Sequence, residues 1–136
     1  MNHNFMKYIS IFLALITIFS CTVEKDCNPS SICNPWPYDY GNLNLKLTND
    51  HNDSILIVLY SGYVDDQEVI SEVYTQSNQY SFYLPVGNRY SVEVYYVQGS
   101  VTTVALDGGR LNQETFINCE ETCYREPNLN LNLRKL

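Results

Sequence analysis

The sequence predicts an all-β fold, an antiparallel β-sandwich of about seven to eight strands, and three observations carry this expectation. From about residue 42 onward, apolar and polar residues alternate with a period of two, as in strands that bury one face. Short clusters of Asn, Asp, Gly, Pro and Ser separate these runs, which is typical of turns. No stretch beyond residue 20 has the spacing of an amphipathic helix.

The expected strands follow from this alternation. In residues 42–47 leucine occupies every second position, so the leucines share a buried face and Lys46 falls on the face toward water. Residues 54–60 are continuously apolar, which predicts a central strand covered on both sides. The other expected strands are residues 69–75, 80–84, 90–98, 101–106, 111–118 and 129–133.

The two ends of the predicted sandwich carry similar sequences. Residues 42–47 read NLNLKL, and residues 128–133 read NLNLNL. We interpret them as two strands with the same one-sided burial, because six residues of similarity are too few to indicate a duplicated domain.

Length and charge exclude several classes of protein. The chain has 136 residues, which suits a single ordinary domain. Fifteen acidic residues outnumber eight basic ones, and the formal charge is −7. Nucleic-acid binding requires clustered Lys and Arg, whereas here only Arg134 and Lys135 are adjacent. We therefore expect no nucleic-acid partner.

The first 21 residues have the features of an export signal. Residues 9–19 form an apolar run preceded by Lys7, too short to span a bilayer as a helix and typical of the centre of a signal peptide. The run ends in Ile18, Phe19, Ser20 and Cys21, which resembles the lipobox of bacterial lipoproteins. That resemblance implies that residues 1–20 are removed and that Cys21 carries a lipid which anchors the protein to a membrane.

The segment after Cys21 bears on location. Thr22 is not the Asp that commonly retains such lipoproteins in the inner membrane, so the resemblance implies the outer membrane, on its periplasmic or cell-surface face. Residues 22–26 are similar to short charged signals for surface export, but the match is weak, and a solvated tether is the better explanation of these residues. Residues 21–41 are rich in Pro, Asn and Ser, which predicts a tether, and residues 42–136 form the expected globular domain.

Four cysteines besides Cys21 predict two disulfide bonds in an exported chain: Cys27, Cys33, Cys119 and Cys123. Local pairing would join Cys27 to Cys33 and Cys119 to Cys123. Crossed pairing would tie the tether to the region before the last strand, and by closing longer loops it would stabilise more, about 4 kcal/mol per bridge. The sequence leaves both open. The spacings do not suit zinc, and we expect no metal and no cofactor.

A longer motif occupies residues 80–94, YSFYLPVGNRYSVEV. It resembles the transthyretin-like and Cna-B-like sandwiches, also called carboxypeptidase-regulatory-like, in which one strand ends in Leu-Pro-x-Gly and the next begins with Tyr. Pro85 ends a strand, Gly87 tolerates a positive φ, and Tyr90 can cover the edge of the core. The resemblance implies a sandwich fold and no particular activity.

Tyr83 and Tyr95 are the candidate binding residues. The alternation places both on outward faces, and if their strands pair through the turn at residues 85–88, both rings lie on one surface. Such a surface would suit a glycan or a protein. The alternative is that tyrosine simply suits strands.

The sequence contains no recognisable catalytic set, since His51 is the only histidine after the leader. We therefore expect a non-enzymatic, lipid-anchored binding or structural module of the cell envelope. One alternative is a pilus or surface-assembly component that donates residues 128–133 to a neighbouring subunit. Another is an accessory of extracellular carbohydrate or peptidase systems.

Overall fold

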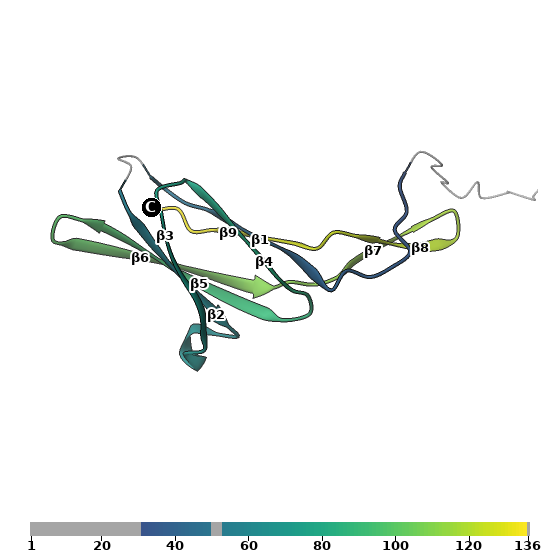
Figure 1. Ribbon diagram of the computed structural model, residues 1–136, viewed down its shortest axis with the longest axis horizontal. Coiled ribbons are helices and arrows are strands. Elements are labelled where there is room, and N and C mark those ends of the chain that lie inside the picture. The colour runs from purple at the N-terminus through teal and green to yellow at the C-terminus, as the bar shows by residue number, and fades with distance from the viewer. Residues whose placement is uncertain (1–30, 50–52, 136) are drawn as a thin grey trace, which may run out of the picture.

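The computed structural model describes residues 31–49 and 53–135, and it is all-β (Figure 1). The leader, Cys21 and Cys27, which carry several of the expectations above, lie outside these residues, as does His51. The strands of the described part are β1 (Tyr40–Lys46), β2 (Ile55–Ser61), β3 (Val69–Thr75), β4 (Gln79–Pro85), β5 (Arg89–Gln98), β6 (Val101–Arg110), β7 (Glu114–Asn118), β8 (Glu121–Arg125) and β9 (Asn128–Asn132), with a short 3-10 helix, η1 (Val64–Asp66), between β2 and β3.

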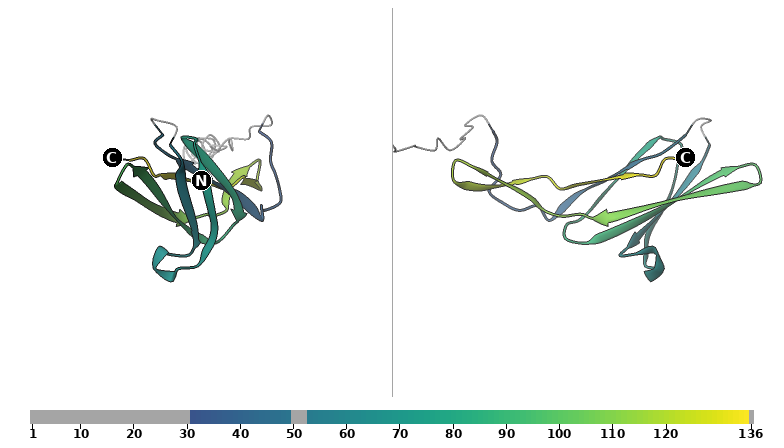
Figure 2. Two further views of the ribbon diagram at one scale, coloured as in Figure 1. Left: turned by 60° about the vertical axis from the view of Figure 1, so that its left-hand side comes forward. Right: turned by 180° about the vertical axis from the view of Figure 1, so that it is seen from behind.

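The strands form a sandwich of two sheets, which confirms the predicted fold class (Figure 2). One sheet has three strands in the order β4-β1-β9, and the other has four in the order β3-β2-β5-β6. A separate hairpin, β7-β8, projects from one end of the sandwich. Every pair is antiparallel except β1 and β9, which run parallel with Leu43 opposite Leu129 and Leu45 opposite Leu131.

The core lies between the two sheets, where the alternating side chains meet. Its fully buried members include Leu43 and Leu45 of β1, Ile57 of β2 and Val92 and Val94 of β5. β2 lies between β3 and β5, which confirms its predicted central position. Its outward-facing Val58 is buried, but among the described residues no further layer covers this face, so the expected coverage on both sides is not observed. Lys46 is exposed, as the alternation predicts.

The turn after β4 connects the two sheets. Gly87 has φ +88, the left-handed conformation that the motif requires. Tyr90 is only 3% exposed, and its hydroxyl donates a 2.8 Å hydrogen bond to the Pro85 carbonyl. However, β4 pairs with β1 and β5 pairs with β2, so the expected pairing of residues 80–84 with 90–98 is wrong. β4 is an edge strand of the three-stranded sheet, whereas β5 is an inner strand of the four-stranded sheet.

Part of the expected tether is held against the β7-β8 hairpin. Asn34 forms a bridge with Tyr124, whose amide donates to the Asn34 carbonyl over 2.8 Å. The Tyr38 amide donates to Gln113 Oε1 over 2.9 Å, and residue 33 is bonded through its sulfur to Cys123. We call residues 33–38 together with β7 and β8 the arm.

The boundary of the sandwich also differs from the expectation. β1 begins at Tyr40, two residues before the expected start at Asn42. The backbone explains this: the Asn42 amide donates to the Pro127 carbonyl over 2.9 Å, and a Cβ atom on Gly41 would lie 2.5 Å from the same oxygen. Because glycine has no Cβ atom, the backbone at residue 41 can approach the carbonyl of residue 127 closely where the chain enters the sheet.

β9 completes the sheet of its own chain and also contacts the opposite sheet. Its pairing with β1 extends from Asn128 to Asn132. At the end of β9, the Asn132 amide donates to Asp107 Oδ2 of β6 over 3.1 Å. This hydrogen bond joins the two sheets along the side where β6 and β9 are the edge strands. β3 and β4 are the edge strands on the other side.

Replacing Tyr96 by Phe tests how the layers are joined. The Tyr96 hydroxyl donates to the Leu133 carbonyl over 2.6 Å and accepts from the Thr48 amide over 3.2 Å. Because both partners would lose a bond inside the protein, we expect a loss of about 1–3 kcal/mol in unfolding free energy, measured by urea denaturation. Tyr74→Phe, at a ring 71% exposed on β3, is the control and should change stability little. Equal losses in the two variants would contradict this assignment.

Removing the bond between Cys33 and Cys123 tests the arm. The two cysteines are 90 residues apart, so the double variant Cys33→Ser, Cys123→Ser should lose about 2–5 kcal/mol in unfolding free energy. Guanidinium unfolding followed by circular dichroism measures this loss, and the folded spectrum should keep its β character because the sandwich core is untouched. A loss of less than about 1 kcal/mol would mean that the arm unfolds independently of the sandwich.

Candidate functional site

The two tyrosines expected on one surface lie on opposite outer faces of the sandwich. Tyr83 is on β4 and is 64% exposed, with its ring stacked on Tyr40 at 5.5 Å between centroids. Tyr95 is on β5, and its hydroxyl donates a 2.8 Å hydrogen bond to Glu93 Oε2. The predicted joint surface of Tyr83 and Tyr95 is therefore wrong, because their strands lie in different sheets. Each ring belongs to a different candidate surface.

The first surface is the outer face of the three-stranded sheet, which we call the amide face. The cross-strand register aligns Tyr83 with Asn42 and Asn128, Ser81 with Asn44 and Asn130, and Gln79 with Lys46 and Asn132. Tyr40 precedes these rows at the start of β1, two residues after residue 38 of the arm. None of these outward strand positions carries a carboxylate.

The amides of this face bind one another. Ser81 Oγ donates to Asn44 Oδ1 over 2.8 Å, and Asn44 Nδ2 donates to Asn130 Oδ1 over 3.2 Å. Asn42 Nδ2 donates to Glu126 Oε1, which lies just outside the sheet, over 2.8 Å. The in-register parallel pairing of β1 and β9 produces this arrangement because it places like side chains side by side. The amides are consequently held in defined orientations.

The end of the amide face away from the arm is cationic. Lys46 and Arg134 line a groove of about 170 Å³ with Asn130, Leu131 and Asn132. Within residues 31–49 and 53–135, neither cation is joined to a carboxylate. Two positive side chains that no described carboxylate pairs with therefore lie beside the amides, on a protein whose formal charge is negative.

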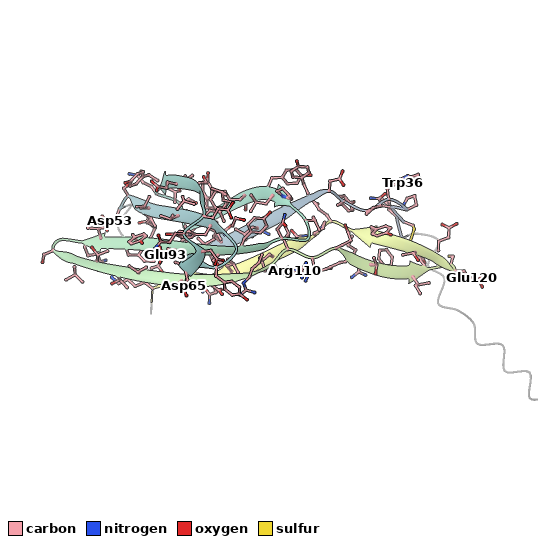
Figure 3. The ribbon with its side chains drawn as sticks, turned by 90° about the horizontal axis from the view of Figure 1, so that it is seen from below. Trp36, Asp53, Asp65, Glu93, Arg110 and Glu120 are labelled. Atoms are coloured by element: carbon pink, nitrogen blue, oxygen red, sulfur yellow. A yellow bond between two sulfur atoms is a disulfide. The ribbon has the colours of Figure 1, made fainter. Side chains whose placement is uncertain are left out.

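The second surface is the outer face of the four-stranded sheet, which is apolar and acidic. One row aligns Tyr74, Leu56, Tyr95 and Val104, and the next aligns Glu72, Val58, Glu93 and Leu106. Figure 3 labels Glu93 of β5 within this sheet. The two outer faces of the sandwich thus differ in chemistry.

Glu93 accepts hydrogen bonds from two tyrosine hydroxyls on this second surface. Its Oε2 atom accepts hydrogen bonds from Tyr60 over 2.7 Å and from Tyr95 over 2.8 Å. The hydrogen bond to Glu93, followed by burial and by the negative charge of Glu93, raises the pKa of Tyr60 to about 12. The hydrogen bond from Tyr95 to Glu93 likewise raises the pKa of Tyr95. The two tyrosine hydroxyls therefore resist ionisation, and their hydrogen bonds hold the side chains where β2 and β5 meet.

A third hollow lies beside η1. Arg89 stacks over the Tyr63 ring at 4.3 Å, and its Nε atom is buried without a hydrogen-bond partner in the described part of the chain. The two residues line a groove of about 230 Å³ together with Asp65 and Asp107. One guanidinium and two carboxylates leave this groove with one negative charge in excess.

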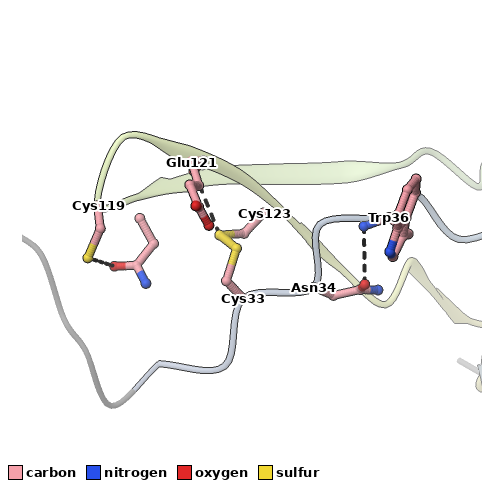
Figure 4. The surroundings of a disulfide bond; sticks show 7 residues. Cys33, Asn34, Trp36, Cys119, Glu121 and Cys123 are labelled. Carbon is pink, nitrogen blue, oxygen red and sulfur yellow. Dashed lines mark hydrogen bonds between the residues drawn. A yellow bond between two sulfur atoms is a disulfide. The ribbon is translucent and has the colours of Figure 1, made fainter.

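Cys33 is bonded to Cys123, a pair that belongs to the crossed option that the sequence left open (Figure 4). The bond between Cys33 and Cys123 excludes both local pairs, and Cys123 is fully buried. Cys119 is also disulfide-bonded, and its partner lies outside the described residues.

Two general features complete the site description. Among the residues that the structure describes, no three His, Cys, Asp or Glu side chains are grouped so as to hold a metal ion. The same residues include no helix long and apolar enough to cross a membrane. Comparison with protein-family models, curated proteins and solved structures finds no match to this chain.

The amide face escaped the sequence prediction although a signal for it was present. The similarity of residues 42–47 and 128–133 indicates equal burial, and it also places asparagine at every outward position of both segments except Lys46. Only the parallel pairing of β1 and β9 shows that these asparagines form a single surface.

The Tyr60 hydroxyl gives a prediction about pH. Its folded-state pKa of about 12 lies above the ordinary value of 10.0, so the bond to Glu93 stabilises the fold fully below pH 10 and is lost as pH rises toward 12. Ultraviolet titration of wild type and Tyr60→Phe should give a difference curve near pH 12. In a Glu93→Gln background this curve should move back toward pH 10, because the main cause of the shift is gone. A wild-type difference curve already centred near 10.0 would refute the assignment.

Proposed function

We propose that the protein is a non-enzymatic, lipid-anchored module of the bacterial cell envelope, held at the outer membrane, that presents a β-sandwich to a glycan or protein partner. The apolar run at residues 9–19 and the lipobox-like residues ending in Cys21 support the anchor. The motif at residues 80–94 and the observed sandwich support a place among the transthyretin-like or Cna-B-like folds.

The observation that carries the proposal is the arm. Asn34 is fixed to β8 by a backbone hydrogen bond to Tyr124, and Cys33 is fixed to it by the bond to Cys123. Ser31 lies ten positions after Cys21, so a fully extended chain between them reaches at most about 36 Å. A lipid on Cys21 would therefore hold the arm near the membrane, with the sandwich continuing from the arm (Figure 1). The outer faces of both sheets would remain open to a partner.

The shape of the described surface favours binding over catalysis. The amide face and the face around Glu93 are outer surfaces of β-sheets, and the described hollows are shallow grooves. β9 is hydrogen-bonded along β1 of its own chain, so donation of this strand to a neighbour would first have to break that pairing. We therefore retain the binding module as our proposal over strand exchange.

Replacement of Cys21 tests the anchor. Wild-type protein expressed in a lipoprotein-processing bacterium should incorporate labelled fatty acid and sediment with the outer membrane. Cys21→Ser should lose the label and leave the membrane fraction, because the lipid is the attachment. Cys27→Ser is the matched control and should keep both properties. Membrane retention of an unlabelled Cys21→Ser protein would contradict the proposal.

Mapping of the disulfides gives an independent test of the same proposal. Cys119 is disulfide-bonded, and Cys33 is occupied by Cys123. If Cys21 carries lipid, its sulfur is unavailable, so we expect mass spectrometry of unreduced peptides to join Cys119 to Cys27. A peptide joining Cys119 to Cys21 would exclude the lipid anchor.

A further inference from the structure

The amide face differs from the rest of the surface in charge. The chain carries a formal charge of −7, yet the outward strand positions of the amide face include no Asp or Glu. The opposite outer face presents Glu72 and Glu93 among apolar side chains. A protein partner usually buries an apolar centre, which the rows of asparagine on the amide face do not offer. This face suits a hydroxyl-rich ligand better than a protein.

The side chains of the face match the groups of a sugar. Each asparagine amide offers a donor and an acceptor, which can bond to neighbouring hydroxyls. Asn44 is already oriented by Ser81 and Asn130, so little side-chain entropy remains to be lost when a ligand binds. At the end near the arm, the stacked rings of Tyr40 and Tyr83 are 47% and 64% exposed and can pack against the apolar face of a sugar ring.

The cationic side chains that line the groove at the other end favour a negatively charged ligand. Lys46 and Arg134 line it, and neither is paired with a carboxylate in the described part of the chain. A guanidinium binds a carboxylate through two parallel hydrogen bonds, and the nearby ammonium adds charge. A ligand with a carboxylate at this end would therefore complement both cations.

We propose that the amide face binds a linear polyuronate, an acidic glycan with a carboxylate on each sugar. A carboxylate lies at Lys46 and Arg134, sugar hydroxyls bond to the asparagine amides, and a ring packs on Tyr83. This inference rests on the proposed binding module and specifies the class of its partner.

Calorimetry with the full-length lipoprotein in detergent tests the inference, with oligogalacturonate as the probe and a neutral galactose oligomer of equal length for comparison. We expect the oligogalacturonate to bind and the neutral oligomer to bind at least about tenfold more weakly. The double variant Lys46→Gln, Arg134→Gln should lose about tenfold or more in affinity. The charge-matched control Arg110→Gln, Arg125→Gln, which changes residues off the amide face, should bind as wild type does.

A second pair of variants tests the aromatic contact. Tyr83→Ser should weaken binding of oligogalacturonate, whereas Tyr74→Ser, at a similarly exposed ring on the opposite outer face, should not. The inference is overturned if wild type does not bind oligogalacturonate or if the two double variants lose affinity equally. It is also overturned if dextran sulfate binds as tightly, because the attraction would then be to anions in general. Absence of fatty-acid label on the wild-type protein, by contrast, would overturn the anchor and leave the glycan result intact.

Discussion

The structure depends on the alternation of leucine with polar residues in β1, because this strand is the centre of one sheet. Its leucines enter the core while its asparagines and Lys46 remain outside. β4 pairs along one edge and β9 along the other, so both neighbours inherit the same division between inward and outward positions. A shift of one residue in this register would turn the leucines toward water and the amides into the core. The same alternation and register therefore produce both the amide face and the core.

Much of the sandwich could be predicted from the sequence, since period-two patterns determine which side chains are buried. β3 agrees with the expected bounds, and β2, β4, β5 and β9 agree to within a residue or two. Pairing partners are determined by long-range contacts that the pattern does not encode. The pattern therefore gave no warning that Tyr83 and Tyr95 lie in different sheets or that β9 runs parallel to β1.

The arm was the least predictable element, for a different physical reason. β8 buries only Cys123 deeply, so its sequence ETCYR lacks the repeated apolar positions by which strands are recognised. β7 begins at Glu114 because Leu111, at the start of the expected strand, belongs to the core of the sandwich. What holds the arm together is a covalent bond and a few backbone contacts, whose partners are distant in sequence. The candidate site shares this difficulty, because Arg134 and the asparagines of β9 meet Lys46 only after folding.

The bond between Cys33 and Cys123 has a consequence for the order in which the molecule matures. Such bonds form in oxidising compartments and are absent from a newly made chain in a reducing cytosol. The core of the sandwich contains no cysteine, so the sandwich can fold without oxidation. The arm is crosslinked only after its two cysteines are oxidised. Under the export that we propose, the polypeptide would cross the membrane without this crosslink, and the bond between Cys33 and Cys123 would form only on the oxidising side.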